Sequence, residues 1–387
     1  MRCDGLAKKD KVWIVSLIFL CVLNCRRVGR ESPIAVNISN SERDANHPAI
    51  AVDPFGNVHV VWMEGLGTEE EIFYAMKSAD SDDWTSPMNI SNNSRASRFP
   101  TIAADNDGNV HIAWQDASPY LSGWKIFYVV KLADGTWSIP ETLFPGNVAA
   151  PKLVIDDMNN VHIIFERLVG GITYEVYYAM KPPDGIWTAP VNLSNTPDGQ
   201  EFRKDIAVNG HGNVYVVWES DCTFPEHLSD IFYTMRSTDG VWTTPINLSQ
   251  TYEPSSNPSI TADPSNNIHI VWKELGGDLA YMTIIPFSNH TQSQASTIFH
   301  NATFPVIGSD REGNLHLVWQ QYKYENHLWY AKKTKDGWTT PIRIYETQEA
   351  AGTYPDIAVD INGYVHVVWR DCMERLGNHD IYYTCIK

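Results

Sequence analysis

The segment Asn57–Trp62 reads NVHVVW, and the rest of the sequence is organised around it. Similar segments recur along the chain, each closing on an aromatic residue: Asn109–Trp114, Asn160–Phe165, Asn213–Trp218, Asn267–Trp272, Asn314–Trp319 and Tyr364–Trp369. The closing aromatic residues are 47 to 54 residues apart. A period of this length, held along the chain, indicates a repeat architecture.

Each repeat predicts four short strands. The first is apolar and ends in Asp, as in Pro48–Asp53, and a turn with Gly or Asn at positive φ follows. The NVHVVW segment is the second strand, and the third contains a Tyr. The fourth begins at a Trp with Pro three residues later, as in Trp84 and Pro87, and Pro favours an edge strand. Four antiparallel strands repeated seven times predict an all-β fold, a seven-bladed β-propeller.

The two ends of the sequence predict how the propeller closes. The last repeat stops at Lys387 after its third strand. Residues 32–39 match Ser86–Ser91 in their Pro and in Asn-Ile-Ser. We therefore expect residues 32–39 to complete the seventh blade, which removes two exposed strand edges. The fifth repeat is irregular, because it lacks the fourth-strand Trp and carries a polar insertion at Phe287–Gln294.

Composition and charge restrict the class of partner. The formal net charge is −17, and such an acidic body repels phosphate backbones, so we expect no nucleic-acid partner. Residues 1–30 predict a signal peptide or an N-terminal membrane anchor, with the apolar run at residues 12–23. That run is shorter than the about 20 residues of a membrane span and suits a signal peptide. Residues 31–387 predict a single propeller domain, extracellular or at the cell surface.

The cysteines and histidines do not indicate a metal centre. Cys222, Cys372 and Cys385 are the three cysteines of the propeller domain, and an odd number cannot all pair internally. No spacing typical of a zinc site is present. We therefore expect no metal site and no cofactor.

An Asp and a His stand six residues apart in six of the seven repeats. Asp53 and His59 are the first such pair, and the fourth repeat replaces both residues, with Asn209 and Tyr215. The joint change predicts that the two positions contact each other. Because an enzyme needs one catalytic relay and not six, we interpret the pairs as buried structural contacts. The pattern is similar to the Asp–His–Trp network of tryptophan–aspartate repeat propellers.

Seven N-glycosylation sequons are present, at Asn37, Asn89, Asn92, Asn192, Asn247, Asn289 and Asn301. Four of them are the repeat's own Asn-Ile/Leu-Ser at the end of the outer strand. These four are explained either by glycosylation or by a strand end that needs hydrogen-bonding residues.

The loops on one face of the propeller are where the repeats diverge. On a rigid scaffold such loops usually carry the functional site. Candidate ligand-binding residues in the loops between second and third strands are Glu64, Tyr120, Trp124, Glu219, Phe224, Tyr324 and Asp371. The segments that lead into the first strands add His47, Arg98, Phe99, Phe202, Arg203, Phe304 and Tyr354. Aromatic faces beside planar hydrogen-bonding groups suit a sugar or a protein surface, and an ordinary polar rim is the alternative.

The turns between third and fourth strands carry a family resemblance. Ser237–Trp242 and Asp134–Trp137 are similar to shortened Asp-boxes, and the chain resembles the sialidase-like, Asp-box (BNR) repeat propellers over nearly all of residues 32–387. In that family the box is a structural turn. Ser97–Pro100 keeps the Arg-x-Pro part of the sialidase Arg motif.

The resemblance implies a set of catalytic candidates. Arg98, Arg203 and Arg370 would bind a carboxylate, and Asp116 would be the acid. No Tyr–Glu nucleophile pair stands out, and sialidases usually have six blades.

These patterns leave several functions open. The first is an exported or cell-surface propeller that binds a glycan or an extracellular protein through the face rich in loops. The alternatives are an exo-glycosidase of the sialidase type and a structural surface protein without a pocket. A lyase that uses the histidines of the repeat is the least favoured, since those residues have a structural explanation.

Overall fold

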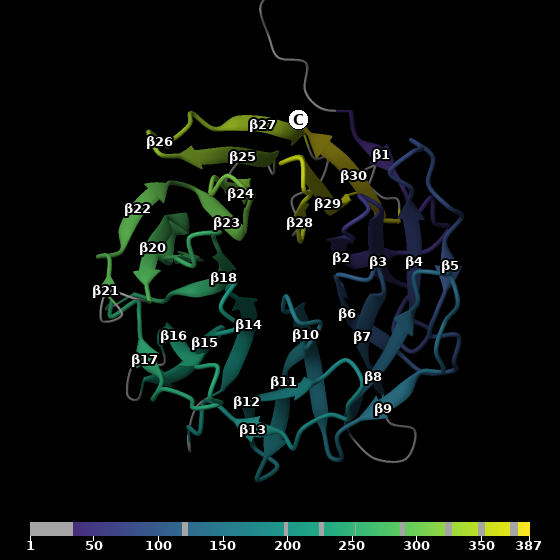
Figure 1. Ribbon diagram of the computed structural model, residues 1–387, viewed down its shortest axis with the longest axis horizontal. Coiled ribbons are helices and arrows are strands. Elements are labelled where there is room, and N and C mark those ends of the chain that lie inside the picture. Colours follow the sequence, from purple (N-terminus) through teal and green to yellow (C-terminus); the bar gives the residue numbers. More distant parts are fainter. Residues whose placement is uncertain are drawn as a thin grey trace, which may run out of the picture. The chain divides into compact units, whose positions relative to one another are not determined.

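Seven antiparallel blades surround one axis in the computed structural model, which describes residues 34–117, 123–196, 200–223, 228–251, 253–286, 291–321, 327–346, 353–371 and 378–387 (Figure 1). The innermost strands are β2 (Ala45–Val52), β6 (Ser97–Ala104), β10 (Val148–Ile155), β14 (Glu201–Val208), β18 (Ser256–Ala262), β23 (Ala302–Ser309) and β28 (Asp356–Val359). Each inner strand contacts the inner strands of the two neighbouring blades, and β28 contacts β2 to complete the circle. The predicted seven-bladed β-propeller is therefore confirmed.

The second and third strands form the middle of each blade. The second strands are β3 (Val58–Glu64), β7 (Val110–Ala117), β11 (Val161–Val169), β15 (Val214–Thr223), β19 (Ile268–Lys273), β24 (Leu315–Gln321) and β29 (Val365–Asp371). The third strands are β4 (Glu71–Lys77), β8 (Trp124–Lys131), β12 (Thr173–Lys181), β16 (Leu228–Arg236), β20 (Leu279–Ile285), β25 (His327–Thr334) and β30 (Asp380–Ile386). The second strands are buried on both faces because a blade packs on each side, which explains their continuous apolar runs.

The outer strands are short. They are β5 (Met88–Asn89), β9 (Glu141–Leu143), β13 (Val191–Asn192) and β17 (Ile246–Asn247), followed by β21 (Thr291–Gln292) with β22 (Ser296–Phe299) in blade five and β26 (Gly337–Trp338) with β27 (Ile342–Glu346) in blade six. The irregular fifth blade thus fills its outer position with two segments, and a 3-10 turn at Leu275–Gly277 precedes its third strand.

The seventh blade is closed by the N-terminal strand, as predicted. β1 (Val36–Asn37) pairs with β30, and the Ile38 amide donates to the Ile381 carbonyl at 2.8 Å. Ser39 Oγ also donates to Asp380 at 2.6 Å. The residues of the predicted targeting segment, with the apolar run 12–23, lie outside the described residues. Within the described residues, no helix is long and apolar enough to cross a membrane.

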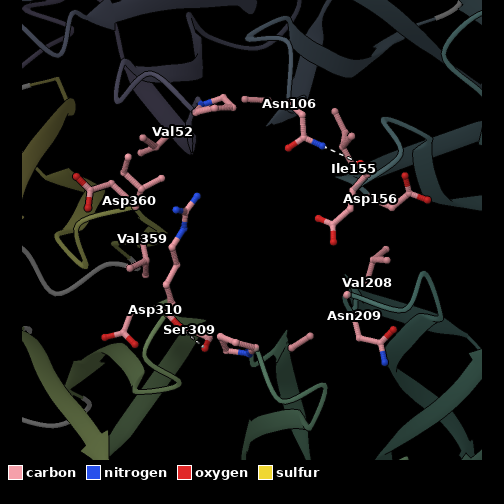
Figure 2. Close-up of a pocket in the computed structure, with 18 of the residues that line it drawn as sticks. Val52, Asn106, Ile155, Asp156, Val208, Asn209, Ser309, Asp310, Val359 and Asp360 are labelled. Carbon is pink, nitrogen blue, oxygen red and sulfur yellow. Dashed lines mark hydrogen bonds between the residues drawn. The ribbon is translucent and has the colours of Figure 1, made fainter.

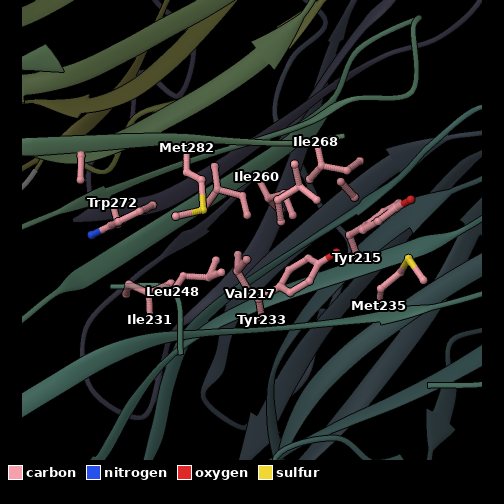
Figure 3. Packing of buried hydrophobic residues seen from close by; sticks show 14 residues of the cluster. Tyr215, Val217, Ile231, Tyr233, Met235, Leu248, Ile260, Ile268, Trp272 and Met282 are labelled. Carbon is pink, nitrogen blue, oxygen red and sulfur yellow. The ribbon is translucent and has the colours of Figure 1, made fainter. Parts of the chain in front are cut away.

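The hydrophobic core is divided into clusters that lie between neighbouring blades. Figure 3 shows one of them, in which Trp272, Ile260 and Ile268 of blade five pack against Val217 and Tyr233 of blade four. Burial of this apolar surface provides most of the free energy that holds one blade to the next.

The repeated Asp, His and Tyr residues form one buried network in each of six blades. In blade three, His162 Nε2 lies 3.2 Å from Asp156 Oδ2, and His162 Nδ1 lies 2.8 Å from the Tyr178 hydroxyl. The expected Asp–His contact is confirmed, and the structure adds Tyr as the third member. Burial alone would raise the pKa of the Asp156 carboxyl, but hydrogen bonds from His162 and Asn160 outweigh burial and lower that pKa to about 2. In blade four the replacement residues also meet, with Asn209 Nδ2 3.1 Å from the Tyr215 hydroxyl.

The outer-strand Trp of one blade packs edge-on against the network Tyr of the preceding blade. Trp137 meets Tyr74, with ring centroids 5.1 Å apart, and Trp242 meets Tyr178 at 4.9 Å. The same contact joins blade one to blade seven through Trp84 and Tyr383. The repeat Trp and Tyr residues therefore stabilise the interfaces between blades.

The turns of the repeat have the predicted geometry. The hairpin between first and second strands has a residue at positive φ in every blade: Gly56, Gly108, Asn159, Gly212, Asn266, Gly313 and Gly363. The Asn of the outer-strand sequons caps the turn that follows, as where Asn89 Oδ1 accepts from the Asn92 amide at 2.8 Å. The sequon Ser donates to a third-strand carboxylate, as Ser194 does to Glu175 at 2.5 Å. A structural role therefore accounts for these repeated sequons.

Candidate functional site

Six of the seven inner strands begin with the same irregularity in the described structure. The pairing register shifts by a β-bulge near the start of six inner strands, for example between Asn46 and Ala49. One residue within each bulge has a positive φ, and so does the residue at the equivalent position before β28. These φ values lie between 29° and 53°. These seven residues, which we call the bulge ring, are His47, Phe99, Ala150, Arg203, Asn257, Phe304 and Tyr354.

The bulge ring is strained backbone held by the fold. Positive φ is rare for residues with large side chains, costs about 1–3 kcal/mol each, and clusters at functional sites. Pro follows the ring residue in six blades, as Pro48 follows His47, and Lys204 replaces it in blade four. Because Pro has no amide proton, it is found in sheets mainly at edges and bulges. A Pro near the start of each of these six inner strands is therefore the sequence signal that marks the ring, and the repeat pattern alone does not reveal it.

Four neighbouring members of the ring form a continuous aromatic surface. His47 stacks on Tyr354 with centroids 4.5 Å apart, and Phe99 meets the His47 ring edge-on at 4.7 Å. Phe304 meets Tyr354 at 5.0 Å. We call Phe304, Tyr354, His47 and Phe99 the aromatic arc. It spans blades six, seven, one and two, whereas blades three to five contribute Ala150, Arg203 and Asn257 to the ring.

Two guanidinium groups act on His47. Burial first, and then the positive charges of Arg370 and Arg98, together lower the pKa of His47 to about 4. His47 is therefore neutral at physiological pH. Its Nδ1 is buried and accepts or donates no hydrogen bond within the described part of the chain.

The two arginines are themselves held in place. Arg98 Nε pairs with Glu70, its Nη2 donates to the Gly67 carbonyl at 2.9 Å, and its guanidinium lies 5.2 Å from the centre of the Trp124 ring. Arg370 Nη2 lies 2.6 Å from His379 Nε2. Fixed guanidinium groups are suited to binding a carboxylate or a sulfate.

Arg203 lies in blade four, away from Arg98 and Arg370. Its side chain is 55% exposed, and Nη1 lies 3.4 Å from Glu219 Oε2. The same Glu219 oxygen accepts from the Asn257 amide at 3.2 Å. The structure thus brings Arg98 and Arg370 to one residue, His47, and places Arg203 and Glu219 together in another part of the ring.

A carboxylate two residues after the repeat Trp accepts a hydrogen bond from that Trp in several blades. Glu64 accepts from Trp62 Nε1 at 3.2 Å, and Asp116 accepts from Trp114 Nε1 at 2.8 Å. Asp116 is 2% exposed, its second oxygen accepts from Asn93 at 2.9 Å, and burial raises its pKa. Asp371 is buried at the same position of blade seven. The remaining candidates, Tyr120, Phe224 and Tyr324, lie outside the described residues.

A cavity of about 410 Å³ lies at the opposite end of the inner strands (Figure 2). Six residues separate His47 from Asp53 along β2, which is about 20 Å of extended strand. The cavity is lined by the hairpin turns, and Asp310 and Asp360 point away from its centre. Their carboxylates already accept from turn amides and face the network histidines. The bulge ring, with strained residues and fixed guanidinium groups, is therefore the better candidate site.

Comparison with known proteins supports the fold. No family model matches the chain, and no curated protein matches it in sequence. Among solved structures, a protein of unknown function from Dyadobacter fermentans superposes with a TM-score of 0.58 and 14% identity, over 91% of this chain and 97% of that one. A polysaccharide lyase, a PL25 ulvan lyase bound to -[GlcA(1-4)Rha3S]-, gives a TM-score of 0.64 and 10% identity, over 90% and 95%.

The intramolecular trans-sialidase from Ruminococcus gnavus, in complex with oseltamivir carboxylate, gives a TM-score of 0.52 and 9% identity, over 93% of this chain and 98% of that chain. At such identities the similarity concerns the fold alone. The chain therefore has the fold of the sialidase-like β-propellers, as the resemblance implied.

The turn at Asp134 has hydrogen bonds of its own: Asp134 Oδ1 accepts from the amide and hydroxyl of Thr136 at 2.9 and 2.7 Å. The assignment of such turns as shortened Asp-boxes stays a prediction.

Proposed function

We propose that the protein recognises a glycan at the bulge ring. The observation that carries the proposal is the aromatic arc with Arg98 and Arg370 beside it. Sugar rings pack their apolar faces on aromatic side chains, while planar hydrogen-bonding groups fix their orientation. The structural neighbours that act on glycans support this choice. A glycan partner also fits the prediction of an extracellular or cell-surface protein, with residues 12–23 as a possible tether. An extracellular protein partner is the remaining alternative.

The charges favour an acidic sugar. A guanidinium binds a carboxylate or sulfate through two parallel hydrogen bonds, and Arg98 and Arg370 lie on a molecule whose net charge is −17. Guanidinium groups on an otherwise acidic protein provide a specific attraction for an anionic group. Neutral His47 adds a polar contact without a charge of its own.

A binding measurement tests the proposal. Isothermal titration of the full chain with uronate-containing, sulfated and uncharged oligosaccharides should show binding of an acidic ligand. His47→Ala and Tyr354→Ala should each weaken binding about tenfold or more, since each removes a stacking face. Phe55→Ala is the matched control, because Phe55 is an exposed aromatic residue in a hairpin turn at the other end of the inner strands. Equal loss in the control would contradict a site at the arc.

A second candidate function, β-elimination from a uronate, is favoured by the position of His47, which stacks on Tyr354 and lies beside Arg98 and Arg370. A neutral imidazole can accept the proton from C5 of a uronate whose carboxylate is bound by Arg98 and Arg370. The C5–H electrons then form the C4–C5 double bond, the C4–O bond breaks, and the leaving oxygen takes a proton from Tyr354 or water. The network histidines are tied to Asp and Tyr and are not needed for this step.

One activity assay separates the enzymatic candidates from binding alone. A lyase produces an unsaturated uronate with a new ultraviolet absorbance, and His47→Gln should abolish it. The sialidase-type glycosidase, with Arg98, Asp116, Arg203 and Arg370 as its predicted residues, should release the fluorophore from an aryl sialoside and lose activity in Arg98→Ala. No turnover of either substrate would leave glycan binding as the function. A surface protein without a site would show neither turnover nor binding.

A further inference from the structure

The position two residues beyond each bulge-ring residue forms a second layer around the axis. These residues, which we call the inner layer, are Ala49, Thr101, Lys152, Asp205, Ser259, Val306 and Asp356. Four of them accept a hydrogen bond from an inner-strand amide of the next blade, at 3.0–3.3 Å: Thr101, Asp205, Ser259 and Asp356. The layer therefore lies where neighbouring inner strands meet, directly beneath the bulge ring.

Lys152 is the cation of this layer. Its side chain is exposed, and it makes no hydrogen bond or ion pair with any residue that the structure describes. Its charge lowers the pKa of Lys204 and opposes the burial-induced rise in the pKa of Asp356. Asp356 belongs to blade seven and Lys152 to blade three, so the charge acts across the axis. Lys152 thus combines an exposed side chain with a position on the inner strand β10.

Arg203 adds a second exposed cation on the neighbouring blade. Among the residues that the structure describes, its contact with a carboxylate is to Glu219 at 3.4 Å, and that carboxylate oxygen also accepts from a backbone amide. Lys204, which lies between Arg203 and the inner layer, is fully buried and pairs with Glu166 at 2.7 Å. Lys152 and Arg203 are therefore two cations of blades three and four, within the inner layer and the bulge ring, that a ligand can reach. They stand opposite the aromatic arc of blades six, seven, one and two.

We propose that Lys152 and Arg203 form a second anion-binding subsite across the axis from Arg98 and Arg370. The ligand is then a polysaccharide that carries negative charge on at least two of its sugars, as carboxylate or sulfate groups. This inference rests on the proposed function, since it extends the same site to a longer acidic chain. An uncharged sugar, or one with a single charge, would use only half of the cations.

Two ligands that differ in charge number test the subsite. The full chain is titrated with an oligomer of uronic acid and with an oligomer of equal length that has one uronate and otherwise neutral sugars. Lys152→Met should weaken binding of the multiply charged oligomer about tenfold and leave the singly charged one unchanged. Arg203→Met should act in the same direction. Arg98→Ala should weaken both ligands. A sulfated neutral oligomer, run in parallel, distinguishes sulfate from carboxylate as the preferred group.

Lys335→Met is the matched control, because Lys335 is an exposed lysine in a turn between third- and outer-strand segments, at the other end of the blades. It should bind both ligands as the unchanged protein does. Thermal unfolding of each variant confirms folding. If Lys152 serves only to balance the charge of Asp356, Lys152→Met will lower stability without changing affinity, which overturns the subsite. If the unchanged protein binds none of the oligomers, the proposed function itself fails.

Discussion

At the scale of single residues, the contacts of a side chain decide its role more than its type does. His162 is held by Asp156 on one ring nitrogen and by Tyr178 on the other, so it has no free atom for chemistry. His47 stacks on Tyr354 and keeps one buried nitrogen without a partner in the described structure. The sequence shows the first kind of histidine by repetition, whereas the second kind becomes distinct only through its neighbours.

Tyr178→Phe tests the structural role of the network. With the Asp156 carboxylate ionised, His162 Nε2 donates to it and Nδ1 accepts from the Tyr178 hydroxyl. Removing the hydroxyl leaves a buried acceptor unpaired, which costs about 1–3 kcal/mol. We expect that loss in chemical denaturation. Tyr177→Phe is the control, since Tyr177 is the next residue on β12 and is only partly buried. Equal effects from the two substitutions would argue against the network.

Glu201 gives a prediction for pH. Burial raises the pKa of this carboxyl to about 7, and its Oε2 makes no hydrogen bond to the described residues. The folded protein therefore keeps a proton that the unfolded chain, with its ordinary pKa of 4.5, releases. This contribution to stability is present below pH 4.5 and is lost as the pH rises toward 7. The midpoint of thermal unfolding should fall over that range relative to Glu201→Gln. A constant difference between the two proteins would contradict the buried, protonated carboxyl.

At the scale of the strand, the bulge at the start of six inner strands is the feature that shapes the candidate site. A regular strand would point alternate side chains toward and away from the axis, whereas the bulge re-aims one residue per blade. His47, Phe99 and Tyr354 owe their mutual contacts to this common geometry. We predicted these residues as part of the variable face but placed them in loops, and the structure has His47 and Phe99 inside strands.

Ala150→Gly tests whether the bulge is strained. Ala150 has a φ of 47°, where a Cβ is unfavourable and glycine is not. The substitution should raise the free energy of unfolding by about 0.5–1 kcal/mol. Ala149→Gly, one residue earlier and without positive φ, should instead lower it by a similar amount. If Ala150→Gly destabilises the protein as much as its neighbour does, the bulge residue carries no strain.

At the scale of the whole molecule, closure through β1 holds the first and last blades together. A chain that begins at residue 42 lacks the β1–β30 pairs and the Ser39–Asp380 hydrogen bond. Each lost hydrogen bond is worth about 1 kcal/mol, so we expect unfolding to become easier by roughly 3 kcal/mol. The exposed edge of β30 should also promote association, visible by light scattering. A chain that begins at residue 34 keeps β1 and should behave like the full-length protein. Identical unfolding of the two shortened chains would argue against this closure.

Most of the fold can be predicted from the sequence because the same strand pattern occurs seven times. The number of repeats predicts the number of blades, and the constant Asp–His spacing predicts that these two side chains meet. The match between residues 32–39 and the outer strand predicts how the seventh blade closes. The site follows much less, because it consists of the residues that differ between repeats. Nothing in the sequence alone says that Arg98 and Arg370 act on the same histidine, since 272 positions separate them and only the closed circle brings blades two and seven to either side of blade one. The roles of Arg98, Asp116, Arg203 and Arg370 stay predictions.

The bulge ring also has a consequence for how such proteins diversify. Seven positions share one backbone conformation and the same direction, yet each belongs to a different copy of the repeat. If the ring binds the ligand as proposed, a mutation at one of them would alter recognition while the hydrophobic clusters and buried networks stay intact. A gene that duplicates a blade therefore duplicates a variable position along with its support. Ligand preference can in this way drift one blade at a time, which is consistent with propellers that share the fold at 9–14% identity.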